Sequence, residues 1–223
     1  MRERLEKVIA HRGLASRREA KDLIMRGLVN VNGKVVTVPG FGVTETDAIN
    51  VMLEDKESYL VYKPRGIETN KTTKTARDLH DVYKQLKHLS PIGRLDTESE
   101  GLIVMSNDGT LTKALTKENS TIGKTYLVTV RESVSTAALL RMKNGIVLDR
   151  IKTKPAETTR KSRTSFTIVL HEGRKHQIRR MCDACKLTVE SLVRIGIGHL
   201  SLGSMKSGQS KKLSPKDVEL LKH

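Results

Sequence analysis

The feature that most constrains the fold is a series of short apolar segments, beginning at residue 59 and interrupted by helical patterns. The apolar segments are typical of strands and lie at residues 59–62, 102–105, 126–130 and 166–170. The helical patterns lie at residues 76–86, 111–116, 135–143, 174–185 and after Ser214-Pro215. This spacing is not that of regular βαβ units, and no glycine-rich nucleotide-binding motif is present. We therefore expect an α+β fold with a mixed, largely antiparallel sheet.

The first fifty residues follow a different pattern. Residues 2–11 and 16–27 have helical apolar faces. Residues 29–37 read as a hairpin, because Asn32-Gly33, which favours a type I′ turn, lies between two β-branched stretches. The predicted division is a small α/β domain at 1–50, a linker at 51–58 and a larger domain at 59–223.

Basic residues gather on and around the second helix of the small domain. A capping box formed by Ser16 and Glu19 opens this helix. Arg17 and Arg18 occupy its first turn, where positive charge opposes the helix dipole by about 0.3–1 kcal/mol, so helix stability does not explain them. Binding of phosphates would explain them. The predicted basic face for an RNA backbone consists of Arg12, Arg17, Arg18, Lys21, Arg26 and Lys34.

The charge of the whole chain points to a polyanionic partner. Lys and Arg number 41 against 25 Asp and Glu, which gives a net charge of +16 and favours nucleic acid. Half of that excess lies between Arg150 and Arg180, a stretch that could also be an ordinary solvated surface. Because aromatic residues make up only 3% of the chain, a platform that stacks several bases is disfavoured.

Metal, cofactor and membrane classes are disfavoured as well. Cys182 and Cys185 form one C-x-x-C without a second ligand pair at zinc-site spacing, so we expect reduced core thiols and no metal. We expect no cofactor. No apolar run approaches the ~18 residues of a membrane helix, and the N-terminus has no signal-peptide pattern. We therefore expect a soluble, cytoplasmic protein.

Three residues stand out as candidates for chemistry. Asp96 lies on a glycine-flanked connection just before a strand, and loops on rigid scaffolds often carry function. Arg179 falls at the margin of a helix's buried side, where a guanidinium needs an anion. Tyr126 begins a strand. Each residue also has an ordinary explanation when taken alone. Asp96 could belong to an exposed acidic loop or a carboxylate metal site, Arg179 to a basic surface helix, and Tyr126 could be an ordinary aromatic residue of a sheet.

Taken together, the motifs resemble the RsuA/RluB/RluE/RluF family of RNA pseudouridine synthases, with the large-subunit RluF type the most similar. SRREAKDLIMRGLVNVNGKVV resembles an S4 RNA-binding domain over about fifty residues. The stretches that match the synthases are YLVYKPRGI at 59–67, PIGRLDTESEGLIVMSNDG at 91–109, KTYLVTV at 124–130, EGRKHQIRRMC at 172–182 and LVRIGIGHLSLG at 192–203.

The resemblance implies roles for individual residues. Asp96 would be the catalytic aspartate, Tyr126 the active-site tyrosine and Arg179 the basic partner of the aspartate. Arg94 would help to hold the flipped nucleotide. The basic cluster that precedes and opens the predicted helix at 174–185 would bind RNA through Arg174, Lys175 and Arg180. We expect ribosomal RNA as the substrate, with tRNA as a further possibility, and a monomeric enzyme.

Two other functions fit parts of the sequence. A non-catalytic S4-bearing RNA-binding or ribosome assembly protein would not need Asp96, Tyr126 and Arg179 to converge. A glycosidase-type hydrolase would need two carboxylates about 5 to 9.5 Å apart, for which Glu98 or Glu100 could partner Asp96. The missing glycine-rich loop disfavours a methyltransferase.

Overall fold

The computed structural model describes residues 2–52, 55–117 and 120–222. The chain divides into two compact units, residues 1–56 and 57–223. Strand β5 (Ile49–Val51) pairs within the first unit, and β6 (Ser58–Lys63) opens the second. Residues 53 and 54 of the expected linker lie outside the described residues. Among the residues that are described, no helix is both long and apolar enough to cross a membrane.

The first unit contains the helices and the hairpin that the sequence predicts. Its elements are β1 (Glu3–Arg4), α1 (Leu5–His11), α2 (Arg17–Met25), β2 (Val29–Val31), β3 (Lys34–Val35), β4 (Gly42–Val43) and β5. The capping box of Ser16 and Glu19 is formed in both directions. Asn32 and Gly33 have φ values of 52° and 83°, as a type I′ turn requires. Leu5, Ile9 and Ile24 are fully buried in the core beneath α1 and α2.

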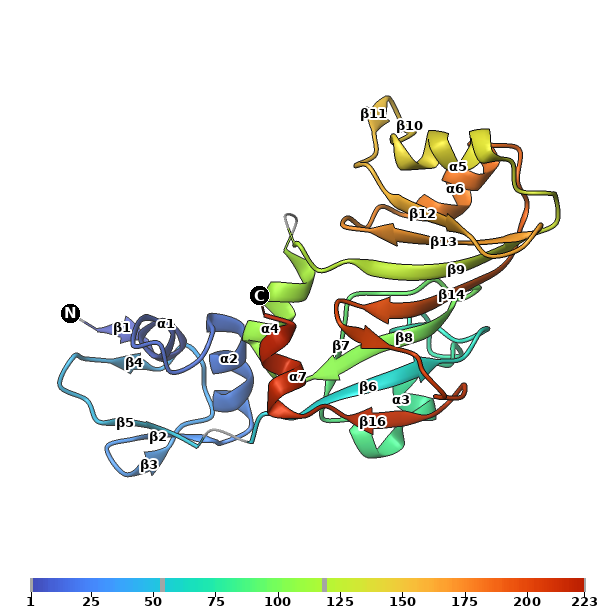
Figure 1. The fold of residues 1–223 in the computed structure, drawn as a ribbon. Coiled ribbons are helices and arrows are strands. Elements are labelled where there is room, and N and C mark those ends of the chain that lie inside the picture. The colour runs from blue at the N-terminus through green and yellow to red at the C-terminus, as the bar shows by residue number, and fades with distance from the viewer. Residues whose placement is uncertain (1, 53–54, 118–119, 223) are drawn as a thin grey trace. The chain divides into compact units, whose positions relative to one another are not determined.

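The second unit is built on a nine-stranded sheet with the order β12-β13-β9-β14-β8-β6-β16, with β15 and β7 at its margins (Figure 1). Its remaining strands are β7 (Ser90–Ile92), β8 (Glu100–Ser106), β9 (Lys124–Val130), β12 (Glu157–Arg160), β13 (Ser165–Leu170), β14 (Val189–Ile197), β15 (Leu200–Ser201) and β16 (Ser210–Lys212). A separate hairpin consists of β10 (Val147–Leu148) and β11 (Ile151–Lys152). Among these described strands only β14 and β8 pair in parallel, which confirms the expected mixed, largely antiparallel sheet.

The helices of the second unit lie close to the predicted positions, with two differences. They are α3 (Leu79–Val82), the 3₁₀ turn η1 (Lys84–Leu86), α4 (Gly109–Thr116), α5 (Thr136–Lys143), α6 (Gln177–Ala184) and α7 (Pro215–Leu220). The helix expected at 76–86 is shorter because the Asp78 side chain caps α3, and it breaks at Tyr83, where ψ is 64°. The helix expected at 174–185 starts later because His176 has a left-handed φ of 53°.

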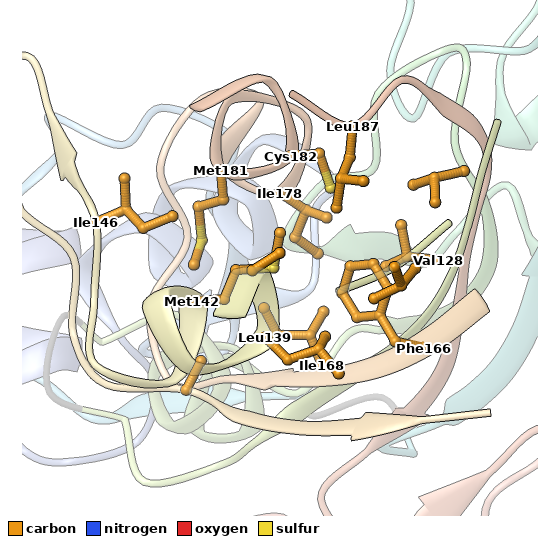
Figure 2. Close-up of a cluster of buried hydrophobic side chains, with 14 of the residues drawn as sticks. Val128, Leu139, Met142, Ile146, Phe166, Ile168, Ile178, Met181, Cys182 and Leu187 are labelled. Carbon is orange, nitrogen blue, oxygen red and sulfur yellow. The ribbon is translucent and has the colours of Figure 1, made fainter. Parts of the chain in front are cut away.

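Strand β8 is buried on both faces, as its continuous apolar run indicates. Leu102 and Val104 pack into a cluster with residues of α4 and α7. Ile103 and Met105 point to the other face and pack with residues of α3 and η1. A third cluster joins α5 and α6 to strands β9 and β13, as Figure 2 shows for Phe166 and its neighbours. The sheet therefore has a fixed centre on which a site can be built.

Candidate active site

One cavity brings together the three residues proposed for chemistry. It has a volume of about 1050 Å³, and Asp96, Tyr126 and Arg179 all line it, as does Arg94. Asp96 comes from the connection between β7 and β8, Tyr126 from β9 and Arg179 from α6. An adjoining cavity of about 380 Å³ is also lined by Asp96 and Arg179. Residues far apart in sequence thus converge at the centre of the sheet.

The connection that carries Asp96 is fixed at both sides of the carboxylate. The backbone N–H of Leu95 donates to the Thr69 hydroxyl oxygen at 3.0 Å, and the same hydroxyl lies 2.8 Å from the Leu95 carbonyl. Beyond Asp96, the Ser99 N–H donates to the Asp96 carbonyl, and the Lys63 ammonium donates to the Ser99 carbonyl at 2.8 Å. These bonds hold the backbone on both sides of Asp96. The Asp96 side chain itself is 41% exposed and lines the cavity.

Two basic side chains lie near the Asp96 carboxylate. The His176 Nδ1 atom is 3.9 Å from an Asp96 carboxylate oxygen. Arg179 lines both cavities with Asp96, but its Nη2 donates to the Glu98 carbonyl at 3.0 Å. Among the described residues, the ionic partner within 4 Å of Asp96 is therefore His176 and not Arg179. His176 was not predicted as a site residue, although it lies inside the basic motif at 172–182.

A row of four residues crosses the centre of the sheet beside this carboxylate. The register pairs Lys63 on β6 with Gly101 on β8, Gly101 with Arg194 on β14, and Arg194 with Tyr126 on β9. Residues that are opposite each other on neighbouring strands project from the same face. Two cationic side chains therefore flank a glycine, and the second one lies beside the tyrosine.

Both cations of this row are buried. Lys63 is 0% exposed, and burial lowers the pKa of its ammonium group to about 8, against the opposing charges of Glu100 and Asp96. Arg194 is 3% exposed and lines the cavity of Asp96. Neither residue was predicted as a site residue. A signal was present for Arg194, since a charged residue stood inside the apolar strand pattern of residues 192–197.

The structure divides the predicted RNA-binding residues into two groups. Six are exposed and make no side-chain hydrogen bond or ion pair among the described residues, namely Arg17, Arg18, Lys21, Lys34, Arg94 and Lys175. Others are already engaged. Arg12 donates to the carbonyls of Glu45 and Asp47, and Arg26 pairs with Asp22.

Arg174 and Arg180 hold the β10–β11 hairpin against the segment around α6. The Arg174 guanidinium donates to the carbonyls of Ile151 and Lys152. Arg180 Nη2 lies 2.6 Å from the Asp149 carboxylate at the tip of the hairpin. Their observed contacts therefore fix the protein's own backbone next to Arg179.

The neighbouring carboxylates are placed differently from Asp96. Glu98 forms an ion pair with Arg65 at 2.9 Å, and Glu100 lines neither of the two cavities. Glu98 and Glu68 do line the adjoining cavity with Asp96, but Glu98 is paired with Arg65 and the Glu68 carboxylate accepts hydrogen bonds from Thr72. Neither is therefore a free second acid of the kind that a glycosidase-type hydrolase requires. Within the described parts of the chain, no group of three side chains could hold a metal ion.

Comparison with known proteins decides the family. A family model described as RNA pseudouridylate synthase matches residues 57–184. The chain belongs to this family. An S4 domain model matches residues 3–49 of the same synthase, so the predicted resemblance and the expected α+β fold are both confirmed.

Full-length relatives agree with this family. The synthase is 38% identical to "Ribosomal large subunit pseudouridine synthase B" of Bacillus subtilis, over 99% of this chain and 96% of that protein. It is 32% identical to "Dual-specificity RNA pseudouridine synthase RluF" of Escherichia coli K12, over 98% of this chain and 77% of that protein. A crystal structure of a pseudouridylate synthase aligns with a TM-score of 0.74 and 27% identity, over 98% and 99% of the two chains.

Proposed function

We propose that this synthase converts a uridine of ribosomal RNA, in the large subunit, to pseudouridine. The observation that carries the proposal is the convergence of Asp96, Tyr126 and Arg179 on one cavity of about 1050 Å³. The relatives whose names specify the ribosomal large subunit or the RluF type support the RNA class. The net charge of +16 supports a polyanionic substrate.

The reaction detaches uracil from its ribose, turns it and rejoins it through C5. The target uridine must leave its stack to reach the cavity, which costs a few kcal/mol and is cheapest in loops and disrupted helices. Asp96 then acts at the ribose, either by bonding to C1′ or by taking the proton of C2′. Its fixed backbone and partly exposed carboxylate suit both routes.

Tyr126 and Arg179, which both line the cavity, support this chemistry. The Tyr126 ring is partly buried against two hydrophobic clusters and also lines the cavity, where it can stack on the pyrimidine. Arg179 is held by the Glu98 carbonyl next to Asp96, where its charge stabilises the carboxylate and binds the nucleotide. We assign no cofactor to the reaction, because it needs neither a redox change nor phosphoryl transfer.

We expect RNA to be bound by exposed basic residues on the S4 unit and around the cavity. Arg94 and Lys175 line its mouth and are exposed, so they are placed to contact the phosphates around the flipped uridine. The S4 unit adds the exposed residues of α2 and the hairpin as a second grip. We expect the enzyme to act as a monomer in the cytoplasm.

The Asp96→Asn variant tests the proposal. The variant should bind the RNA substrate with near wild-type affinity but form no pseudouridine, because an amide can neither attack C1′ nor take a proton. Asp183→Asn, which changes an exposed carboxylate on α6, is the matched control and should retain activity. Pseudouridine is mapped in ribosomal RNA from cells that carry each variant. Substantial product from Asp96→Asn would refute the assignment, and loss of a modification only in tRNA would change the substrate.

A further inference from the structure

The Arg194 guanidinium is incompletely satisfied by the protein. Its Nε donates to the Leu102 carbonyl at 2.5 Å, and this is its only hydrogen bond among the described residues. The Nη2 atom is buried without a partner. Leaving a buried polar group without a partner costs about 1–3 kcal/mol, and more for a charged group. The side chain nevertheless lines the cavity of Asp96 and stands beside Tyr126 in the sheet.

The charge of this guanidinium is also not neutralised by an acid. Within the described parts of the chain, no carboxylate lies within ion-pair distance of Arg194. The Lys124 ammonium shows the effect, because burial and then the charge of Arg194 lower its pKa. A fold rarely keeps a buried cation without a counter-charge unless a ligand supplies one.

The proposed reaction creates a negative charge at this place. When the C1′–N1 bond breaks, its electron pair goes to N1, so uracil departs as an anion with its charge shared between the ring and its two carbonyl oxygens. In one route a carboxylate oxygen of Asp96 bonds to C1′. In the other, Asp96 takes the C2′ proton and a C1′–C2′ double bond forms. The base then bonds to C1′ through C5. In the first route the Asp96–C1′ bond breaks as this bond forms, and in the second route Asp96 returns its proton to C2′. The base finally loses its C5 proton and gains a proton at N1.

We propose that Arg194 is a further catalytic residue, which stabilises the detached uracil anion while the base turns against Tyr126. The inference rests on the proposed function of the site. A positive charge suits this task because its attraction depends on distance and not on the orientation of the base. A set of fixed hydrogen bonds, in contrast, would hold the base in one orientation. A preorganised charge in a water-poor cavity also requires little reorganisation as the bond breaks.

Three variants separate the charge of Arg194 from its structural role. Arg194→Lys keeps a charge, Arg194→Gln keeps a donor without charge, and Arg194→Met keeps only the apolar stem. In single-turnover reactions at saturating enzyme, we expect Gln and Met to slow pseudouridine formation by about 100-fold or more, the size found for lost oxyanion donors. The Lys variant should stay within about 10-fold of wild type. RNA affinity and thermal unfolding, measured for all three, should change little.

An RNA substrate with 5-fluorouridine at the target position gives a second, independent test of the role of Arg194. Fluorine withdraws electrons and stabilises the detached anion, so cleavage of its glycosidic bond should depend less on Arg194. The ratio of the wild-type rate to the Met or Gln rate, followed as loss of the target nucleoside, should therefore be several-fold smaller than with uridine. An equal ratio for both substrates, or equal rates for Gln and Lys, would overturn the inference. If wild type itself forms no pseudouridine, the proposed function fails instead.

Discussion

Lys63 is a fully buried lysine whose contacts serve the Asp96 connection. Its ammonium group donates to the carbonyls of Pro64, Ile67 and Ser99. All three donors are thus used, and the last bond holds the backbone just beyond Asp96. Burial is nevertheless the dominant influence and lowers the pKa of Lys63 to about 8. The protonation of Lys63 should therefore make the stability of the fold depend on pH.

The pH dependence of stability should reveal this lysine. Between pH 8 and 10.5 the native chain has released the Lys63 proton while the unfolded chain still holds it, so the free energy of unfolding rises with pH. The rise is on the order of 3 kcal/mol. Urea denaturation at several pH values should show it in wild type, and Lys63→Met should lack it. The control Lys211→Met, at an exposed position on β16, should behave as wild type; parallel curves for wild type and Lys63→Met would exclude the linkage.

At the scale of elements, the contact between β8 and β14 depends on Gly101. The backbone there has a φ of +110°, which side-chain-bearing residues rarely adopt. A Cβ atom at Gly101 would lie 2.3 Å from the Arg194 carbonyl oxygen and 2.6 Å from its backbone nitrogen. The two parallel strands can approach only because this side chain is absent. The same approach seats Arg194 between Lys63 and Tyr126.

Gly101→Ala should therefore be severely destabilising. The clash is with backbone that cannot turn away, so we expect a loss of more than about 4 kcal/mol of unfolding free energy. The matched control is Gly93→Ala, which has a φ of +75° but no atom within 4 Å of the added Cβ. It should cost only about 1–2 kcal/mol. Thermal or urea unfolding measures both variants. Similar losses of unfolding free energy would show that β8 and β14 can move apart to accept the added Cβ atom.

Local signals predicted the helices of both units and the strands β6, β8, β9 and β13, but not the nine-residue strand β14 within the same sheet. Capping side chains at Ser135 and Ser214 begin α5 and α7 where the sequence indicated, because a cap acts over three or four residues. The late start of α6 was not predictable, since a left-handed His176 has no distinctive local pattern. The β10–β11 hairpin was also missed, because Asp149 and Arg150 form its turn with positive φ and without glycine.

At the scale of the whole molecule, exposed basic residues are present on both units. The S4 unit exposes Arg17 and Arg18 at the start of α2, where they oppose the helix dipole. The second unit carries the cavity, with Arg94 and Lys175 at its mouth. We expect both units to contribute to RNA affinity through phosphate contacts, which release counterions.

Replacing Arg17 and Arg18 together with Ala should weaken RNA binding and flatten its salt dependence. The slope of log affinity against log salt should fall by about 0.7–0.9 for each lost phosphate contact. Lys7→Ala removes a positive charge from the same unit whose partner is Glu3 at 3.1 Å, and it should change the slope far less. Filter binding across a salt series measures this, and an unchanged slope in the double variant would contradict an RNA role for this face.

The site itself was predictable only in part. Asp96, Tyr126 and Arg179 were proposed from motifs, and they line one cavity. Lys63, Gly101 and Arg194 could not be grouped from sequence, because sheet register alone makes them neighbours. Register depends on the packing of the entire sheet, whereas motifs depend on residues close in the chain.

The pairing of β8 with β14 also determines when the enzyme first becomes competent during synthesis. Gly101 leaves the ribosome long before Arg194, and pairings between such distant segments form late. A nascent chain therefore carries Asp96 before β14 can pair with β8 and bring Arg194 to the site. We therefore expect a polypeptide whose synthesis stops before β14 to be inactive, so that only the finished chain modifies ribosomal RNA.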